Sequence, residues 1–181
     1  MSICYNRFYS INSMQKVILV NSNNKEIGSE EKIKAHKEGL LHRAFSIFVF
    51  NSKGELLLQQ RSKSKYHSGG LWSNTVCSHP RIGESYGLAI HRRMIEEMGF
   101  DCELEKVSEF IYRTELENGL IENEHDTIFI GEYNNEVVPN SEEVMNYKWI
   151  SLPLLKEDIK KSPNNYSSWL KIVLSKNLLK I

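Results

Sequence analysis

The sequence predicts one domain of the α+β or mixed α/β class, with a mixed sheet sandwiched by helices. The chain has 181 residues, of which 40% are hydrophobic and 25% charged, as in a single globular domain. Apolar runs with the two-residue period of strands alternate with runs of helical period. Neither a repeat nor a linker interrupts them. We therefore expect residues 14–181 to form the domain and residues 1–13 to be an N-terminal extension.

The first elements are predicted to be a strand, a helix and a hairpin. Ser29 is a favourable N-cap for the helix, and Gly39 is a favourable residue to end it. The predicted strands cover residues 17–20, 42–50 and 55–60, and a turn over 51–54 joins the last two.

Residues 84–98 have the strongest helical pattern. One stripe at helical spacing contains Leu88, His91, Ile95 and Met98, with Met94 beside them. We expect this stripe to face the core and His91 to be packed or partly buried. Gly99 supplies the left-handed residue that commonly follows a helix.

A hairpin, a further strand and two short helices are predicted for the remaining chain. Asn118-Gly119 is a turn signal between strands over 107–114 and 120–133. A strand over 147–150 follows. The helices begin at Ser151 and Ser167, and the second presents one apolar face made of Leu170, Val173, Leu174 and Leu178.

Formal charges cancel, with 23 Lys and Arg against 23 Asp and Glu. This balance argues against a nucleic-acid or anionic-membrane partner recognised by bulk charge. The charges are nevertheless segregated, because residues 96–143 hold fifteen acids and two bases. Either the two regions are ordinary solvated faces, or a cation-binding side faces an anion-binding side.

The cysteines are odd in number and lack paired spacing, so we expect no disulfide framework and a cytoplasmic location. No apolar run approaches the roughly 20 residues of a membrane-spanning helix. The first thirteen residues show no secretory signal pattern. These observations predict a protein without a membrane partner.

Cys77 is a candidate for chemistry, in the segment Asn74-Thr75-Val76-Cys77-Ser78-His79-Pro80. His79 lies on the same side as Cys77 if the segment is extended. A lone cysteine is commonly inert core, whereas a loop-to-helix junction lowers a thiol pKa and suits a nucleophile or base. The position before the predicted helix favours the second environment.

Glu122 and Glu124 are predicted to point to one face of a strand. They are either solvent-facing or share a cation, because two carboxylates in line repel each other. Neutral ligands for such a cation are His36, His42 and His79, each near a predicted element boundary. Three imidazoles with two carboxylates suit zinc or manganese. His67, His91 and His125 fit no comparable pattern.

The long helix ends in Glu96-Glu97-Met98-Gly99-Phe100, with Arg92 four residues before this tail. This ending resembles much of the Nudix box, whose glutamates bind a magnesium ion that bridges a diphosphate. Arg93 stands where the hydrolases carry a glutamate, and loss of that carboxylate weakens metal-activated hydrolysis. The box is therefore predicted to hold a diphosphate rather than cut it. The alternative is a set of exposed Arg–Glu pairs at helical spacing.

Basic residues near this box are candidates for binding the diphosphate. Arg61, Lys63 and Lys65 stand in the polar loop over 61–70, and Lys32 lies one helical turn before His36. Diphosphate recognition favours such clusters of guanidinium and ammonium groups.

Four motifs stand out together: residues 41–46 (Leu-His-Arg-Ala-Phe-Ser), 58–61 (Leu-Gln-Gln-Arg), 74–80 and 122–124 (Glu-Asn-Glu). Together they resemble type 1 isopentenyl diphosphate isomerase, a non-hydrolysing Nudix-like family of isoprenoid biosynthesis. The resemblance covers residue 14 to the C-terminal helices. It implies conversion of isopentenyl to dimethylallyl diphosphate by protonation to a tertiary carbocation and removal of a neighbouring proton.

The resemblance also implies roles for individual residues. Glu124, helped by Tyr112, is the acid, Cys77 is the base, and Trp169 caps the pocket. The implied ligands of one transition ion, Mn²⁺ or Zn²⁺, are His36, His42, His79, Glu122 and Glu124. Glu97 and the carbonyl of Cys77 match the site of Mg²⁺ that arrives with the substrate. The implied diphosphate-binding residues are Lys32, Arg61, Lys65 and Arg93.

The family implies no flavin, and we expect a monomer with a small-molecule substrate. The loop over 66–72 lacks the aromatic-Pro-Gly of many relatives, and the spacing from His36 to His42 is shorter than in some. Two other functions stay open from the residues alone. One is a Nudix pyrophosphohydrolase that uses Glu96 and Glu97, and the other is a silent diphosphate- or metal-binding module.

Overall fold

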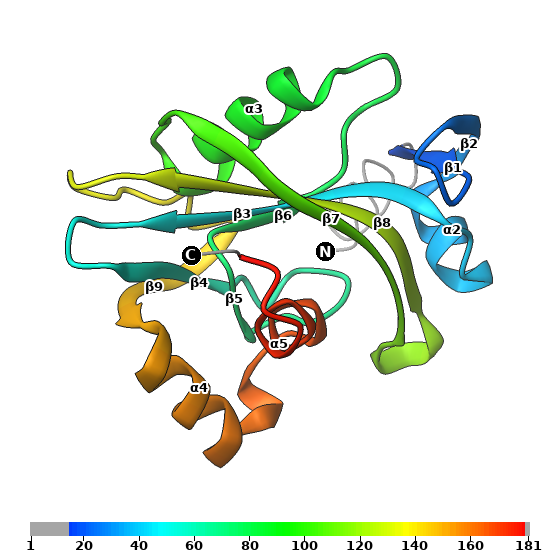
Figure 1. Ribbon diagram of the computed structural model, residues 1–181. Helices are drawn as coiled ribbons and strands as arrows, with labels where there is room; N and C mark the ends of the chain where they lie inside the picture. Colours follow the sequence, from blue (N-terminus) through cyan, green and yellow to red (C-terminus); the bar gives the residue numbers. More distant parts are fainter. Residues whose placement is uncertain (1–14, 180–181) are drawn as a thin grey trace, which may run out of the picture.

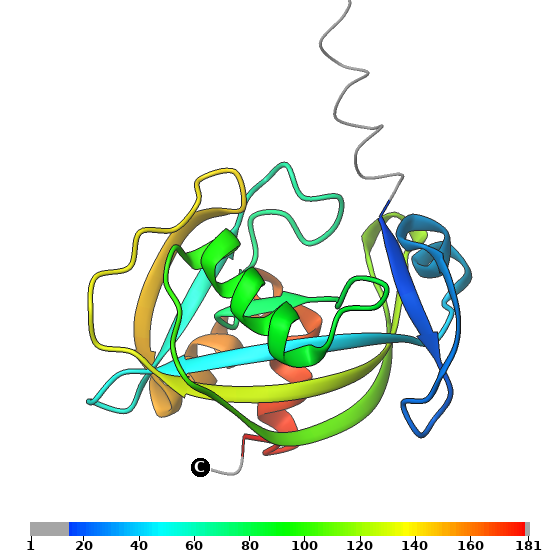
Figure 2. The ribbon, with the colours of Figure 1, turned by 90° about the horizontal axis from the view of Figure 1, so that it is seen from above.

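The computed structural model describes residues 15–179, which form one mixed sheet with helices on both faces (Figures 1 and 2). The predicted extension over 1–13 lies outside the described residues. The strands are β1 Lys16–Val20, β2 Glu26–Glu31, β3 His42–Phe50, β4 Glu55–Arg61, β5 Trp72–Ser73, β6 Val76–Ser78, β7 Leu104–Glu115, β8 Ile121–Glu132 and β9 Val144–Ser151. The α-helices are α2 Lys32–Glu38, α3 Tyr86–Met98, α4 Leu152–Lys161 and α5 Ser168–Ser175.

β3 is the central strand of the sheet. It runs parallel to β8, in register from His42 opposite Glu124 to Phe50 opposite Glu132. Its other neighbour over Phe45–Ile47 is the short antiparallel β6. Because it is covered on both faces, β3 is almost continuously apolar and buried, as its sequence predicts.

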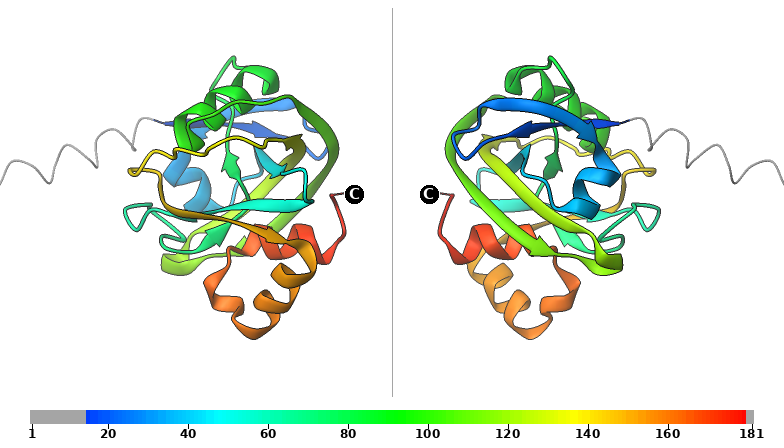
Figure 3. Two further views of the ribbon diagram at one scale, coloured as in Figure 1. Left: turned by 90° about the vertical axis from the view of Figure 1, so that its left-hand side faces the viewer. Right: turned by 90° about the vertical axis from the view of Figure 1, so that its right-hand side faces the viewer.

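Two hydrophobic cores lie on the two faces of the sheet, and Figure 3 shows α3 on one side with α4 and α5 on the other. Alternate residues of β3 face alternate cores. Phe45, Ile47 and Val49 pack with α3, whereas Phe48 packs with α4 and α5. The fold is thus the predicted α+β sandwich.

The predicted hairpin of β3 and β4 forms only at its turn. Phe50 pairs with Leu56, after which β4 diverges and pairs with β9. The segment 73–78 fills the opening: Thr75 Oγ1 donates to the Leu57 carbonyl and accepts from the Val49 amide. The predicted turn and partner strand are confirmed, but the hairpin pairing does not continue beyond the turn, because this segment satisfies the backbone groups of Val49 and Leu57. The opening places Cys77 in the middle of the sheet.

The predicted helix capped by Ser29 begins later. Ser29 lies in β2 opposite Ile18, and α2 starts at Lys32. The prediction was wrong because residues 26–31 fold back on β1 as a hairpin. The predicted end is confirmed, since Gly39 follows α2 with φ of 61°.

The long helix is confirmed from Tyr86 to Met98, with the Ser85 side chain as its N-cap. The predicted apolar stripe is confirmed for Met94 and Met98, which are buried, and wrong for Leu88 and Ile95, which are 67% and 57% exposed. The buried face of α3 consists of Ala89, Ile90, Met94, Glu97 and Met98. The helix is rotated because Glu97 points inward to a buried partner.

The C-terminal elements match their predictions closely. Asn118 and Gly119 turn the β7–β8 hairpin with φ of 64° and 72°. Ser151 and Ser167 occupy the N-cap positions of α4 and α5. The predicted apolar face of α5 packs on the sheet through Leu170, Val173 and Leu174, and Leu178 reaches the same core from beyond the helix.

Candidate active site and metal centre

The candidate site is built on one rung of three neighbouring strands. His42 opens β3 and pairs with Glu124 of β8, which pairs with Tyr112 of β7. Side chains on one rung share a face of the sheet. By the alternation along β3 and β8, this is the face that α5 covers through Phe48 and Ile128.

Three imidazoles and one carboxylate converge beside this rung. His36 of α2, His42, His79 just after β6, and Glu124 each offer one ligand atom, and the four atoms lie within 4.8 Å of one another. His79 Nε2 is 3.0 Å from Glu124 Oε1 and 3.2 Å from His42 Nε2. Within residues 15–179 this is the only group of three or more His, Cys, Asp or Glu ligands.

The donor set fits a divalent transition ion. The Nδ1–H of His36 donates to the Lys32 carbonyl at 2.7 Å, and that of His42 donates to the Leu40 carbonyl at 2.8 Å. Each bond orients its ring and leaves Nε2 as the free donor atom, as in many metal sites. Burial lowers the pKa of His36 to about 4 and that of His79 to about 3, so both rings are neutral at pH 7.

The Tyr112 hydroxyl lies between two buried glutamates, 3.1 Å from Glu122 Oε2 and 2.6 Å from Glu124 Oε2. Burial and the charge of Glu124 raise the pKa of Glu122 well above its usual value. Burial also disfavours charge on Glu124, but hydrogen bonds with His42 and His79 outweigh it and hold the pKa of Glu124 well below its usual value. Glu122 thus retains a proton beside a charged Glu124, and it is not among the four clustered ligands.

Cys77 lies in β6, and its Sγ is 3.0 Å from Asn74 Oδ1 and 3.3 Å from Ser46 Oγ. Burial and the nearby carboxyl group of Asp126 raise the thiol pKa well above its usual value. The expected lowering of this pKa was wrong. Residues 78–85 separate Cys77 from α3, and the groups that hydrogen-bond its sulfur carry no positive charge.

Trp169 of α5 is buried at the same site. Its Nε1–H donates to Ser73 Oγ at 2.8 Å and to Asn74 Oδ1 at 3.1 Å. The Arg61 guanidinium lies 5.2 Å from the centre of the indole, and the His67 ring meets the indole edge-on at 5.9 Å. Trp169 therefore combines core packing with contacts to site residues.

Four cationic side chains lie close enough for their charges to act on one another: Lys32, Arg61, Lys65 and Arg93. Burial and the other three charges lower the pKa of Lys32 to about 7. Burial, together with Arg61 and Arg93, lowers the pKa of Lys65 to about 8, even though Glu97 favours its charged form. A cluster that lowers the pKa of its own lysines favours the arrival of an anion such as diphosphate.

Arg93 binds the carboxylates at the end of α3. It donates to Glu97 Oε1 from Nε at 3.1 Å and from Nη2 at 2.5 Å, and to Glu96 Oε2 at 2.6 Å. Gln59 Nε2 donates to the other oxygen of Glu97 at 2.8 Å. Burial disfavours charge on Glu97, but Arg93 and Lys65 outweigh it and lower its pKa. The Arg93–Glu97 pair is largely buried, so it is not one of the exposed Arg–Glu pairs that the alternative interpretation of the helix predicted.

The loop after β4 contributes two side chains that the motifs did not mark. The buried His67 ring lies 5.8 Å from that of His36, and its Nε2 is 3.8 Å from Glu122 Oε1. The Tyr66 hydroxyl is 3.3 Å from His36 Nε2. The conformation of the loop brings both into the site, and no local periodicity signals it.

Asp126 is a further buried carboxyl group that the motifs did not include. Its Oδ2 accepts from Ser46 Oγ at 2.8 Å, while Oδ1 has no protein partner. The two-residue alternation that places Glu122 and Glu124 on one face also predicts Asp126 there. His91 is partly exposed and pairs with Asp101, and it does not belong to the cluster of His36, His42, His79 and Glu124.

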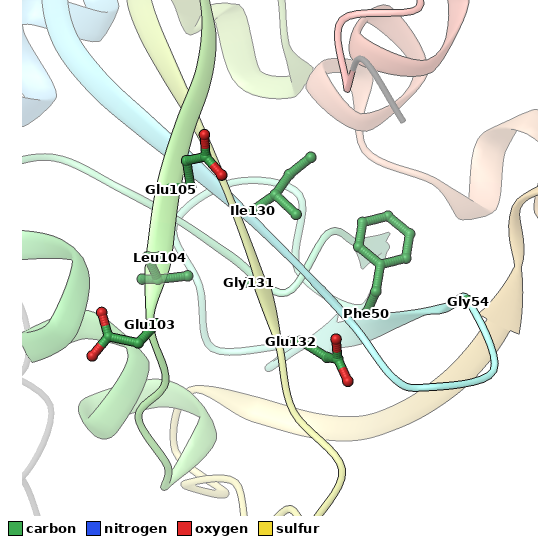
Figure 4. Close-up of a pocket in the computed structure, with 8 residues that line it drawn as sticks. All are labelled: Phe50, Gly54, Glu103, Leu104, Glu105, Ile130, Gly131 and Glu132. Atoms are coloured by element: carbon green, nitrogen blue, oxygen red, sulfur yellow. The ribbon is translucent and has the colours of Figure 1, made fainter.

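A hollow of about 580 Å³ lies elsewhere on the molecule, lined by Phe50, Leu104, Ile130 and three glutamates (Figure 4). It surrounds the far ends of β3 and β8. These ends lie eight positions along the strands from the His42–Glu124 rung. This corresponds to a distance of roughly 26 Å. It is no part of the candidate site.

Comparison with known proteins agrees with this geometry. Residues 40–170 match the family model described as NUDIX domain. The chain is 51% identical over 159 residues to isopentenyl-diphosphate Delta-isomerase 2 of Photorhabdus laumondii, which covers 88% of this chain and 90% of that protein. It is 50% identical over 161 residues to isopentenyl-diphosphate Delta-isomerase 1 of Aromatoleum aromaticum, with 89% and 91% covered.

Solved structures support the fold. A Deinococcus radiodurans protein superposes with a TM-score of 0.74 at 16% identity, covering 91% of this chain and 99% of that one. A MutT protein from Methanosarcina mazei gives 0.61 at 19% identity, with 75% and 91% covered. Among the described helices, none is long and apolar enough to cross a membrane. From its half-identical relatives and its NUDIX domain, the chain belongs to the isopentenyl-diphosphate Delta-isomerase family of the Nudix superfamily.

Proposed function

We propose that this chain converts isopentenyl diphosphate to dimethylallyl diphosphate in isoprenoid biosynthesis. One observation carries the proposal. A half-buried thiol, Cys77, and a buried carboxylate, Glu124, stand on the two strands that flank β3, and Glu124 belongs to the histidine cluster. A proton donor and a proton acceptor on separate strands suit a reaction that adds a proton at one carbon and removes another nearby.

The acid in this proposal is Glu124, assisted by Tyr112. The Tyr112 hydroxyl bridges Glu124 and the proton-bearing Glu122. A proton can therefore pass from Glu122 through Tyr112 to the charged Glu124, which then gives that proton to the terminal alkene carbon. This protonation produces a tertiary carbocation.

Cys77 is the proposed base, which removes the proton from the carbon between the cation and the diphosphate-bearing end. A thiol whose pKa is raised is a strong base once it is a thiolate. The buried indole of Trp169 lies beside this region and stabilises a desolvated cation by about 2 kcal/mol through its π face. The buried surroundings also keep water from quenching the carbocation.

His36, His42, His79 and Glu124 would hold the proposed transition ion, Mn²⁺ or Zn²⁺, and we propose Glu122 as a further ligand beside them. When bound, this ion fixes the orientation of Glu124 and sets its proton affinity. Glu97 and the Cys77 carbonyl would hold Mg²⁺ with the diphosphate. No flavin enters the proposal, because the protonation chemistry needs none.

Lys32, Arg61, Lys65 and Arg93 are the proposed diphosphate-binding residues. Their mutual repulsion without an anion supports this role. Arg93 also neutralises the glutamates that a Nudix hydrolase needs for metal-activated water. We further propose that the protein acts as a cytoplasmic monomer, which accords with Cys77 and Cys102 being free thiols.

The test is incubation with isopentenyl diphosphate, Mg²⁺ and Mn²⁺ in heavy water, followed by NMR. We expect deuterium in the substrate and product and the appearance of dimethylallyl diphosphate. If metal-replete protein shows no exchange and forms no product, the proposal is wrong. Release of phosphate from a panel of nucleoside diphosphate derivatives would instead favour the hydrolase reading, which rests on Glu96 and Glu97.

A further inference from the structure

Glu143 lies just before β9 and reaches two of the four clustered cations. Its Oε2 pairs with Lys65 Nζ, and the same oxygen is 3.5 Å from Arg93 Nη2. Lys65 belongs to the loop after β4 and Arg93 to α3, so one carboxylate joins two elements that are separate in the sequence. An internal anion is therefore seated on the cation cluster.

The backbone holds Glu143 beside the loop after β4. Ser62, the first residue of this loop, donates its amide hydrogen to the Glu143 carbonyl at 2.9 Å, and Arg61 pairs with Val144 in the sheet. The Glu143 amide donates to the Asn140 carbonyl at 3.0 Å. The side chain thus starts from a fixed point, and rotation about its own bonds is enough to leave or regain the two cations.

Glu97, the other carboxylate that binds Arg93 near Lys65, is held more firmly. Its side chain is 2% exposed, and it accepts two hydrogen bonds from Arg93 and one from Gln59. The Glu143 side chain is 25% exposed, and within residues 15–179 its carboxylate pairs with Lys65 and Arg93 alone. Glu143 is therefore the carboxylate that can give way to another anion.

The other two clustered cations, Lys32 and Arg61, form no ion pair with Glu143. Among the described residues, Arg61 Nε is buried without a hydrogen-bond partner. A small anion can bind Lys32 and Arg61 while Glu143 stays in place. A diphosphate that uses all four cations also needs Lys65 and Arg93, and its charge repels a carboxylate already bound to them.

We propose that Glu143 is an internal competitor of the substrate diphosphate: its carboxylate occupies Lys65 and Arg93 in the free protein and leaves them when the diphosphate binds. This rests on the diphosphate site of the proposed function. Substrate and product carry the same diphosphate, so tight binding of both would slow release without aiding the chemistry. A carboxylate that returns to the two cations favours release of the product.

The test measures the affinity of full-length, metal-loaded protein for inorganic pyrophosphate by calorimetry at one pH. Glu143→Gln keeps the size of the side chain and removes its charge. We expect this variant to bind pyrophosphate roughly 3- to 10-fold more tightly than wild type, because a partly exposed ion pair no longer competes. A residue that only held the loop in place would give the opposite sign, because its loss would loosen Lys65.

Glu142→Gln is the matched control, because it removes the same charge from the neighbouring, exposed residue. We expect it to bind pyrophosphate like wild type. A second comparison introduces Glu143→Gln into a Lys65→Met protein. We expect a smaller gain in affinity there, because one of the two cations for which Glu143 competes is absent.

A Glu143→Gln protein with wild-type or weaker affinity overturns the competitor assignment and leaves the diphosphate site in place. An equal gain in Glu142→Gln, or in the Lys65→Met background, also overturns it, because the effect is then one of overall charge. Wild-type protein without affinity for pyrophosphate overturns the diphosphate site itself. A gain that depends on Lys65, in a protein without isomerase activity, supports the competitor and overturns only the isomerase proposal.

Discussion

Cys77 and Trp169 share one acceptor: Asn74 Oδ1 lies 3.0 Å from the Cys77 sulfur and 3.1 Å from Trp169 Nε1. Asn74 cannot rotate away, because its two N–H groups donate to the carbonyls of Ile47 and Val76 at 3.0 and 2.9 Å. The proposed base and the proposed aromatic cap are therefore positioned by one buried amide.

Asn74→Ala should destabilise the fold and misplace the thiol. The change removes the side-chain donor to the carbonyls of Ile47 and Val76, at about 1–3 kcal/mol for each group left unsatisfied, and leaves the indole N–H with Ser73 Oγ alone. Urea unfolding should show a lower free energy of unfolding than wild type. The exposed Asn146 offers a control, and its alanine variant should unfold like wild type. Equal stability of the two variants would contradict this account of Asn74.

The acid–base pair makes a second prediction. Cys77→Ala and Glu124→Gln should each lower turnover at least about 10²-fold, the usual scale of lost acid or base catalysis, while the fold persists. Turnover of isopentenyl diphosphate and circular dichroism measure the two properties. Cys102→Ala and Glu109→Gln change a free thiol and a surface carboxylate outside the site. If Cys77→Ala or Glu124→Gln matches these controls, the assignment of acid and base is wrong.

Much of the fold follows from local patterns because its elements have clear periods and ends. The apolar run of residues 42–50 predicts β3, and Asn118-Gly119 predicts the turn of the β7–β8 hairpin. Ser151 and Ser167 predict the starts of α4 and α5. The start of α2 does not lie where Ser29 predicts it. Ser29 is a favourable N-cap, but it pairs with Ile18 of β1 as part of a strand, so the helix begins after β2. Pairing between strands of this kind is not signalled by the local sequence pattern.

The site is predictable in part for the same reason. The alternation of Glu122 and Glu124 is local, and the structure shows both facing Tyr112. The convergence of His36, His42 and His79 depends on the parallel register of β3 with β8 and on the placement of α2, which are long-range. The thiol environment of Cys77 was mispredicted since it depends on how residues 73–78 enter the sheet.

Removal of an imidazole should lower the metal content. His79→Ala deletes the ring that lies 3.0 Å from Glu124 Oε1 and 3.2 Å from His42 Nε2. Elemental analysis after loading with Mn²⁺ or Zn²⁺ should show less transition metal for each chain than in wild type. His91→Ala removes a partly exposed ring that pairs with Asp101, and should retain the wild-type content. An unchanged metal content in His79→Ala would remove His79 from the centre.

The affinity for inorganic pyrophosphate should depend on Lys32 and therefore on pH. Burial and three neighbouring cations lower the pKa of Lys32 from 10.5 to about 7, so the free protein loses this charge as the pH rises above 7. The anion favours the charged form, so binding above pH 7 takes up a proton, and affinity falls by up to roughly tenfold per pH unit from this group. Lys32→Arg keeps its positive charge over this pH range and serves as the control. The titration of pyrophosphate itself affects both proteins equally, so a difference between them reports the titration of Lys32. Calorimetry at about pH 7 and pH 9 should show a greater relative loss of affinity in wild type than in Lys32→Arg, and equal pH dependence would exclude Lys32 from the diphosphate site.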